Sequence, residues 1–326
     1  MNLAGESLVC NLQCNSEAQL VRNSNNQLNG ITFSDSRQGT RILADDLPRY
    51  VQGQLENRRL KVGAIKHIRR MRGGAQSHLM QCDDGFYYVV KLQNNPQHTR
   101  VLANDWLGTR LGALIGLPMP VTAVVNVDPG LLDSTPALHI ETCGHERSFT
   151  PGLSFGSRYV VAPTEGQVYD YLPEAMMAQV RNVRDFAGVL ALDKWTCNAD
   201  GRQAAFWKKA RDKKFAACFI DQGYCFNADE WSFPDAPLRG VFGRNDVYRC
   251  ITGWVSFKPW LSRIENFPES SIWALAEEIP LEWFNADTEA LQKLLTNLFA
   301  RRSRVRELIW SFKESSRNPF PNWSEA

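Results

Sequence analysis

The order of the secondary-structure signals along the chain is the feature that most constrains its fold. Between residues 61 and 96, short runs of apolar and β-branched residues alternate with turns such as Asp83-Asp84-Gly85. After Pro173, apolar residues recur every three or four positions, which predicts helices over 185–195, 271–279 and 288–312, the last as one long helix or two shorter ones. A β-rich first part followed by a helix-rich second part indicates an α+β protein with a cleft between two lobes.

The same pattern divides the 326 residues into three predicted parts. Residues 1–55 are rich in Asn and Ser and show little apolar periodicity, so we expect an irregular N-terminal extension. Residues 56–165 form the predicted N-lobe, with strands over 77–82, 86–92, 121–127, 138–142 and 157–162 and a helix over 102–115. Residues 166–326 form the predicted C-lobe, whose helices are joined by strands over 204–207 and 214–221.

Composition and charge exclude several classes of protein. Lys and Arg number 37 against 35 Asp and Glu, so no global field draws the chain to nucleic acid or to an anionic membrane. No apolar run approaches the roughly 20 residues that span a bilayer, and residues 1–9 lack the pattern of a signal peptide. Eight scattered Cys are too few for a disulfide framework and indicate a reducing compartment. We therefore expect a cytoplasmic protein with neither a membrane nor a nucleic-acid partner.

Three features between residues 71 and 105 are typical of a phosphate site. A turn between two predicted strands holds the run Gly73, Gly74, Ala75, Gln76 and Ser77. In such a turn, backbone N–H groups can approach phosphates closely. Lys91 lies near the end of an aromatic and β-branched strand, and Asp105 is the only acid in the helix that follows. Each feature alone is ordinary in a turn or on a surface, and only their order along the chain favours a shared function.

The strongest chemical signal comes later, where Asn198-Ala199-Asp200 is followed by Asp221-Gln222-Gly223. Phosphoryl transfer uses two separately placed carboxylates, one that orients or deprotonates the acceptor hydroxyl and one that holds a metal ion against the phosphates. An amide oxygen beside them can complete the metal shell. The two short motifs flank a pair of predicted strands, which would bring both carboxylates to one edge.

Taken together, these motifs resemble the HipA-like kinases, a family of bacterial Ser/Thr kinases related to the HipA toxin. The resemblance extends over about residues 60–312 and is carried by the runs 73–78, 88–97, 114–120, 155–159, 193–200 and 279–283. It implies a two-lobed protein-kinase-like fold, ATP and Mg²⁺ as cofactors, and a Ser or Thr hydroxyl of a protein as the acceptor. It also implies that the adenine lies against the link between the lobes, near residues 156–165.

The resemblance implies a role for each matching residue. Residues 73–77 would cover the phosphates. Lys91 would contact the α or β phosphate, with Asp105 as its partner. Asp200 would be the catalytic carboxylate and Asp221 a Mg²⁺ ligand.

One position departs from the family pattern. The family places a metal-binding Asn five residues after the catalytic Asp, and here that position is Ala205. Gln203 can supply an amide oxygen instead, and Asn198 is a second candidate amide. In another register, Asp193 and Asn198 have the Asp-x-x-x-x-Asn spacing of protein kinases. We prefer Asp200 as the catalytic residue, because the family's Asn-x-Asp falls on Asn198 and Asp200, and Asp193 then anchors the loop.

The sequence leaves the phosphoryl acceptor and the oligomeric state open. One alternative is a small-molecule or lipid kinase, which would use the same pair of carboxylates. Another is a catalytically weak, nucleotide-binding interaction module, which Ala205 favours. The basic stretches 208–214 and 301–306 are interpreted as solvated surfaces rather than binding sites.

Overall fold

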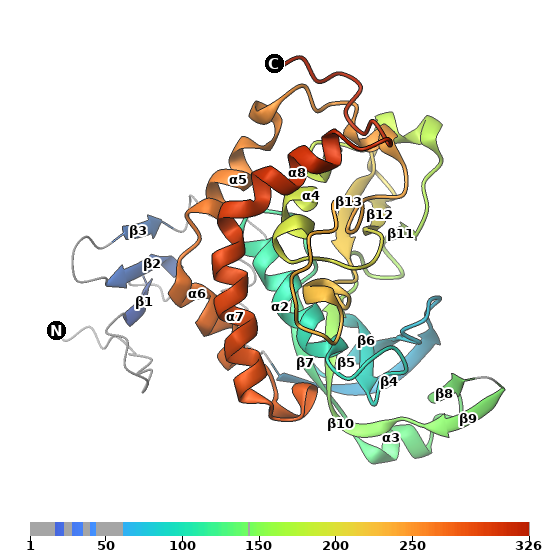
Figure 1. The fold of residues 1–326 in the computed structure, drawn as a ribbon. Coiled ribbons are helices and arrows are strands. Elements are labelled where there is room, and N and C mark those ends of the chain that lie inside the picture. Colours follow the sequence, from blue (N-terminus) through green and yellow to red (C-terminus); the bar gives the residue numbers. More distant parts are fainter. Residues whose placement is uncertain (1–16, 23–27, 35–39, 44–60, 143, 326) are drawn as a thin grey trace. The chain divides into compact units, whose positions relative to one another are not determined.

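The chain divides into two units, Met1–Arg59 and Leu60–Ala326, in a computed structural model that describes residues 17–22, 28–34, 40–43, 61–142 and 144–325. In the first unit, β1 (Glu17–Arg22), β2 (Leu28–Ser34) and β3 (Thr40–Leu43) form an antiparallel sheet in the order β1-β2-β3 (Figure 1). The prediction of an irregular extension is wrong for these strands, because its Asn and Ser content hid short runs of β-forming residues such as Ile31-Thr32-Phe33. The rest of residues 1–55 lies outside the described part of the chain.

Five strands of the second unit close into a barrel. They are β4 (Lys61–Arg70), β5 (His78–Cys82), β6 (Tyr87–Gln93), β7 (Thr122–Val127) and β10 (Thr150–Arg158), in the order β10-β6-β5-β4-β7. Neighbours are antiparallel except β4 and β7, which are parallel. The predicted strand over 157–162 is therefore misplaced by several residues. The strand β10 begins at Thr150, and Gly156 lets it approach β7, where an added Cβ would lie 2.5 Å from Val125.

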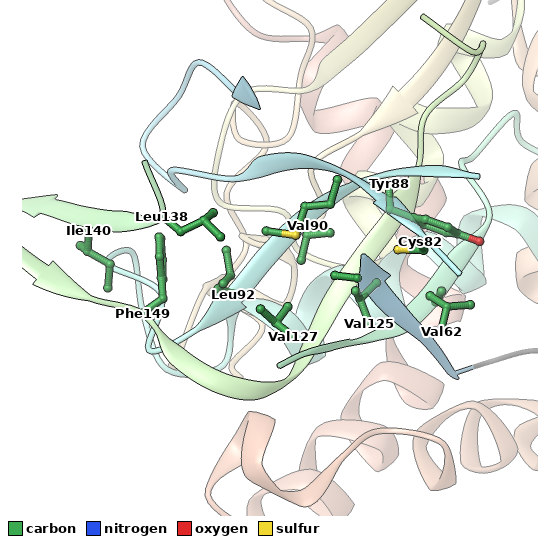
Figure 2. Packing of buried hydrophobic residues seen from close by; sticks show 13 residues of the cluster. Val62, Cys82, Tyr88, Val90, Leu92, Val125, Val127, Leu138, Ile140 and Phe149 are labelled. Atoms are coloured by element: carbon green, nitrogen blue, oxygen red, sulfur yellow. The ribbon is translucent and has the colours of Figure 1, made fainter. Parts of the chain in front are cut away.

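The barrel encloses an apolar core to which every strand but β10 contributes. Figure 2 shows this core running from Ile140 and Phe149 at one end to Val62 and Tyr88 at the other, with Val90 between them. Alternate residues of β6 point inward, as a strand of period two requires. The turn between β5 and β6 matches its sequence signal, since Gly85 has a positive φ of 83° and the Asp84 carboxylate accepts the Phe86 N–H at 3.0 Å.

The helix α2 (Val101–Leu114) follows the barrel strand β6 and is buried over most of its length. It packs against β7 and β10 on one side and against α4 (Asp185–Trp195) and α6 (Glu269–Glu277) on others. A helix that is apolar on all faces belongs in a protein interior. The polar pair Asn104-Asp105 is buried within it, and burial on this scale requires partners for both side chains.

Two smaller sheets complete the strands. The short helix α3 (Pro129–Asp133) precedes a hairpin of β8 (His139–Thr142) and β9 (His145–Ser148). The strands β11 (Gly166–Tyr169), β12 (Gln203–Lys209) and β13 (Ala216–Ile220) form an antiparallel sheet in that order. The hairpin of β12 and β13 matches the two strands predicted around a basic turn.

The later part of the chain is mostly helical, as predicted. α4 packs against α5 (Lys258–Glu265) and α8 (Val305–Lys313), and α6 packs against α7 (Thr288–Arg301) (Figure 1). A short 3₁₀ turn, Arg302–Arg304, separates α7 from α8, so of the two predicted alternatives for 288–312 the structure has two shorter helices. The content is mixed α and β, and the division into lobes at residue 165 stays a prediction. Among the described residues, no helix is long and apolar enough to cross a membrane.

Candidate active site

Three charged side chains from distant parts of the sequence meet beside the barrel. The Lys91 ammonium on β6 donates to the Asp105 carboxylate on α2 at 2.6 Å and to the Asp221 carboxylate after β13 at 2.8 Å. Lys91 and Asp105 are 6% and 2% exposed, while the Asp221 side chain is 21% exposed. The sequence prediction that Lys91 and Asp105 pair is met by this contact. We call these three residues the acidic cluster, because it holds one positive and two negative charges.

Burial and charge act against each other in the acidic cluster. Burial alone lowers the pKa of Lys91, but the two carboxylates outweigh it and the pKa lies above its usual value. Burial raises the pKa of Asp105 to about 6, with Lys91 opposing the rise. Burial also disfavours the Asp221 carboxylate, but Lys91 and Arg202 outweigh it, and the pKa of Asp221 lies below its usual value. Asp221 is therefore ionised near neutral pH and is the more exposed of the two acids.

A second ionic group braces the loop between α4 and β12. The Arg202 guanidinium donates to both oxygens of Asp193, at 2.9 and 2.5 Å, and both side chains are almost fully buried. Arg202 also donates to the backbone oxygen of Ile220 at 2.8 Å and to the Gln222 side chain at 2.8 Å. Burial lowers the pKa of Arg202, but Asp193 outweighs burial and the net shift is upward. Through these contacts, Arg202 joins the loop that carries Asp200 to the loop that carries Asp221.

Asp200 lies on this braced loop and is exposed. Its backbone N–H donates to the Asn198 side-chain oxygen at 3.1 Å, and its backbone oxygen accepts from Gly240 N–H at 3.1 Å. Among the described residues, its carboxylate accepts only the N–H of Gly201, at 2.7 Å. The fixed backbone and the solvent-exposed carboxylate leave Asp200 open to an acceptor hydroxyl, and a general base must reach that proton. Asp193, the alternative catalytic residue, has both oxygens occupied by Arg202, so the geometry favours Asp200.

The two candidate metal-binding amides differ in their surroundings. Gln203 is exposed and its amide nitrogen lies 3.0 Å from the second oxygen of Asp221. Since the two ends of a Gln amide have nearly the same shape, a rotation of the amide turns its oxygen toward a cation held by Asp221. Asn198 is buried, and its amide oxygen holds Asp200 N–H while its nitrogen donates to Asp193 at 3.0 Å. The geometry therefore favours Gln203 as a ligand and gives Asn198 a bracing role.

Ala205, where the family pattern has an Asn, lies within β12 opposite Cys218 and is buried. Its methyl group offers no oxygen to a cation. In the described residues, no group of three or more His, Cys, Asp and Glu side chains could hold a metal. A Mg²⁺ ion bound by one or two carboxylates and by substrate phosphates needs no such cage. Ionised Asp221 with the Gln203 amide fits that kind of site.

The glycine turn predicted over 73–77 lies between β4 and β5. Gly73 has a positive φ of 116° and open space around it, and the turn closes through Met71 N–H on the Ser77 oxygen at 2.8 Å. The Gln76 side chain is bonded to the backbone of Glu141 on β8. Its amide oxygen accepts the Glu141 N–H at 2.8 Å, and its amide nitrogen donates to the Glu141 carbonyl oxygen at 2.6 Å. Gln76 thus fixes the turn, which leaves Gly73 and Gly74 exposed for contact with a phosphate. The roles of Gly73, Gly74, Ala75, Gln76 and Ser77 in nucleotide binding stay predictions.

Sequence reasoning missed a buried amide that shapes the loop after Asp221. The Asn104 nitrogen donates to the backbone oxygens of Gly223, Cys225 and Ala228 at 2.8 to 2.9 Å. Its oxygen accepts from the Trp231 indole at 2.7 Å. Asp105, the next residue, accepts Gln222 N–H at 2.8 Å. One turn of α2 therefore holds residues 222–231, and the only available signal was a polar pair within an apolar helix.

Arg301 corrects the prediction of a solvated basic stretch over 301–306. It is 7% exposed and donates to the backbone oxygens of Lys194 at 2.9 Å and Phe233 at 3.0 Å. A helix face that seemed basic and exposed thus contains a structural arginine, because its partners come from loops distant in sequence. The basic turn 208–214 is largely exposed, as predicted.

Comparison with known proteins gives one family. A family model described as HipA-like kinase matches residues 65–308, which is more than half of the chain. A search of curated proteins gives no match. The matched region contains Lys91, Asp105, Asp200 and Asp221.

Solved structures similar to this chain include two that are described as kinases and one described as part of a toxin–antitoxin system. A Golgi casein kinase has 14% identity over 82% of this chain and 78% of its own, with a TM-score of 0.49. The Helicobacter pylori proinflammatory kinase CtkA has 10% identity over 74% and 98%, with a TM-score of 0.46. HipA of Shewanella oneidensis MR-1, in a complex with HipB and operator DNA, has 11% identity over 89% and 78%, with a TM-score of 0.44. With all three scores below 0.5, the family assignment rests on the match to the family model.

Proposed function

Because the chain belongs to the HipA-like kinase family, we propose that it transfers the γ-phosphoryl group of ATP to a Ser or Thr hydroxyl of a protein. The observation that carries this proposal is the pairing of the acidic cluster with a free carboxylate on a braced loop. Phosphoryl transfer depends mainly on positioning and on charge stabilisation, and both features supply these. Mg²⁺, when bound with ATP, would neutralise charge on the β and γ oxygens.

Each proposed residue has a task that its surroundings support. Asp221, ionised and partly exposed, would hold the cation together with the Gln203 amide. The Lys91 ammonium would exchange its contact with Asp221 for one with an α or β phosphate oxygen, and it would keep its hydrogen bond to Asp105. The N–H groups of the turn at Gly73 and Gly74 would face the phosphates.

Asp200 would take the proton of the acceptor hydroxyl. As that proton leaves, the hydroxyl oxygen forms a bond to the γ phosphorus, and the bond from that phosphorus to the bridging oxygen of ADP breaks. The electron pair of the broken bond stays on ADP. The backbone of Asp200 is fixed by Asn198 and Gly240, so the carboxylate is presented in one place.

A second candidate is a nucleotide-binding module with little transfer activity, and the observation that favours it is Ala205. Without an Asn at that position, the cation has fewer protein oxygens, and the loss of one ligand weakens charge stabilisation.

We also propose that the protein acts in a reducing compartment such as the cytoplasm. The support is that five described cysteines are free thiols, namely Cys82, Cys197, Cys218, Cys225 and Cys250.

Transfer of labelled phosphate from ATP tests this function directly. Wild type, Asp200→Asn and the control Asp133→Asn are compared with protein acceptors and with small hydroxyl compounds. Asp133 is an exposed acid on α3 whose side chain has no hydrogen-bond or ion-pair partner among the described residues, so its change should have no effect. We expect Asp200→Asn to lose about 10²- to 10⁴-fold in rate, the usual worth of a positioned general base, with no change in melting temperature.

The outcomes separate the candidates. Labelling of a small compound but of no protein would replace the protein substrate with a small one. Binding of ATP without any transfer by the wild type would favour the nucleotide-binding module. Full activity of Asp200→Asn would show that Asp200 is not the base.

A further inference from the structure

The outer side of the Asp200 loop is held by one short segment. Gly240 N–H donates to the backbone carbonyl oxygen of Asp200 at 3.1 Å, and the backbone N–H of Arg202 donates to the carbonyl oxygen of Val241 at 2.9 Å. Arg202 and Phe242 form a parallel bridge, so residues 240–242 run beside residues 200–202 as a short strand pair. The inner side of the loop is held separately, because Ala199 N–H donates to the Tyr224 oxygen at 2.9 Å. The position of Asp200 therefore depends on where residues 240–242 lie.

One arginine from a distant part of the chain holds this segment in turn. Arg317 donates from Nη2 to the Phe242 oxygen at 2.6 Å and from Nε to the Asn245 side-chain oxygen at 2.7 Å. The Asn245 amide nitrogen donates back to the Arg317 oxygen at 2.9 Å. Arg317 forms no ion pair with any described residue, so its contacts supply geometry rather than charge neutralisation. A planar guanidinium suits this task, since its fork of donors fixes two acceptors at once.

Arg317 is itself held firmly by the residues that follow it. Phe320 is 3% exposed and makes edge contacts with the rings of Tyr248, Phe257 and Phe312. Further on, Ser324 N–H donates to the Thr252 oxygen at 3.0 Å. Buried aromatic side chains of this size supply most of the packing energy of such a contact. The segment 315–325 is thus anchored to residues 245–257, and Arg317 extends from this anchor to the wall of the Asp200 loop.

We propose that Arg317 is a positioning residue for phosphoryl transfer, which holds Asp200 in place through Phe242 and Gly240. This inference rests on the proposed function, because it takes Asp200 as the base. Arg317 touches neither Asp200 nor the acidic cluster. It acts by fixing the strand-like segment on which the loop backbone rests. A displacement of about 1 Å in a reacting group can cost roughly 100-fold in rate, so a distant brace of this kind affects turnover strongly.

The test compares Arg317→Met, Arg317→Lys and the control Arg249→Met in the full chain. Methionine keeps the apolar stem and removes the donors, while lysine restores one of them. Arg249 is exposed and pairs with Glu174, away from the Asp200 loop. Amide-resolved hydrogen exchange should show Gly240 and Arg202 exchanging at least about tenfold faster in Arg317→Met, with partial recovery in Arg317→Lys. The amides of Ala199 and Gln222, which are bonded on the inner side, should not change.

The transfer assay adds a kinetic readout. We expect kcat to fall by about 10- to 100-fold in Arg317→Met, with the KM for ATP unchanged, because no group that would contact ATP is altered. Unchanged exchange at Gly240 and Arg202 would overturn the inference whatever the rates are. Faster exchange at Ala199 and Gln222 as well would also overturn it, since that result means general loosening. If wild type transfers no phosphate, the proposed function fails, and the exchange rates still decide whether Arg317 braces the loop.

Discussion

Two buried ionic groups are joined at the candidate active site, and they differ in charge balance. In the brace, Arg202 and Asp193 carry one charge of each sign and satisfy one another at two hydrogen bonds. In the acidic cluster, Lys91 faces two carboxylates, and one of them, Asp221, is partly exposed. Removing one partner of a balanced, fully buried pair is costly, whereas a group of three charges with one surplus carboxylate open to solvent attracts a cation. The comparison is consistent with a structural role for Asp193, and it is the basis on which we propose a ligand-binding role for Asp221.

The largest expected effect is at the brace. Replacing Asp193 by Asn leaves the Arg202 guanidinium buried without its counter-charge, which should lower the free energy of unfolding by about 3–5 kcal/mol. Chemical denaturation of wild type, Asp193→Asn and Asp133→Asn measures this. A loss below about 0.5 kcal/mol, the usual range for a surface change, would mean that the Asp193 pair is not a structural brace.

The next effect distinguishes the acidic cluster from the brace. Mg²⁺ should stabilise the wild type by about 2.7 kcal/mol at one hundred times its dissociation constant, through binding to the folded state alone. Asp221→Asn removes the surplus charge and should abolish this stabilisation. Asp133→Asn should keep it. Thermal unfolding at increasing MgCl₂ gives the result, and an undiminished stabilisation of Asp221→Asn would place the cation elsewhere.

A smaller effect comes from a pair of histidines, of which one is buried and the other is half-buried. His67 on β4 and His78 on β5 share a contact of 3.0 Å between ring nitrogens, and His78 Nε2 is buried without a hydrogen-bond partner. Burial, followed by the positive charges of His67 and Arg70, lowers the pKa of His78 to about 3. The folded state therefore resists protonation that the unfolded chain accepts near its ordinary value of 6.5.

This pair should make the protein acid-sensitive. The contribution of His78 to stability is fully present above about pH 6.5 and is lost as pH decreases toward 3, by about 1 kcal/mol for each pH unit. Between neutral pH and pH 5.5, His78 should lower the stability of the wild type by about 1 kcal/mol. His78→Leu should reduce the loss of stability between pH 6.5 and pH 3. His145 is an exposed histidine on β9, so His145→Leu should leave that loss unchanged. An unaltered acid limb in His78→Leu would assign the sensitivity to other groups.

Local patterns predicted the elements well, and the candidate residues in part. The helix α4 has the predicted bounds, 185–195, and α2 begins one residue before the predicted start at residue 102. Both predictions succeed because an apolar period of 3.6 residues is a local property of the sequence. The predicted contact between Lys91 and Asp105 is present, and it was available because kinases pair the strand lysine with an acid of the next helix. The strand β10 was misplaced because Pro151 and Gly152 interrupt its pattern, although the barrel completes its hydrogen bonds.

What the sequence could not supply are contacts that cross long stretches of chain. Asn104 binds carbonyls more than one hundred residues away, and nothing near it in the sequence reveals them. Arg317 and Phe242 are separated by 75 residues. Whether Asp193 or Asp200 is the free carboxylate also depends on Arg202, whose side chain finds Asp193 only once the loop has folded.

The claim that the acidic cluster is a metal and nucleotide site is tested most directly by calorimetric titration of ATP into the protein, with and without Mg²⁺. We predict that Mg²⁺ tightens ATP binding by wild type at least about tenfold, or 1.4 kcal/mol, and that Asp221→Asn loses this gain while Asp133→Asn retains it. A variant Asp221→Asn that binds ATP with the full dependence on Mg²⁺ would contradict the account.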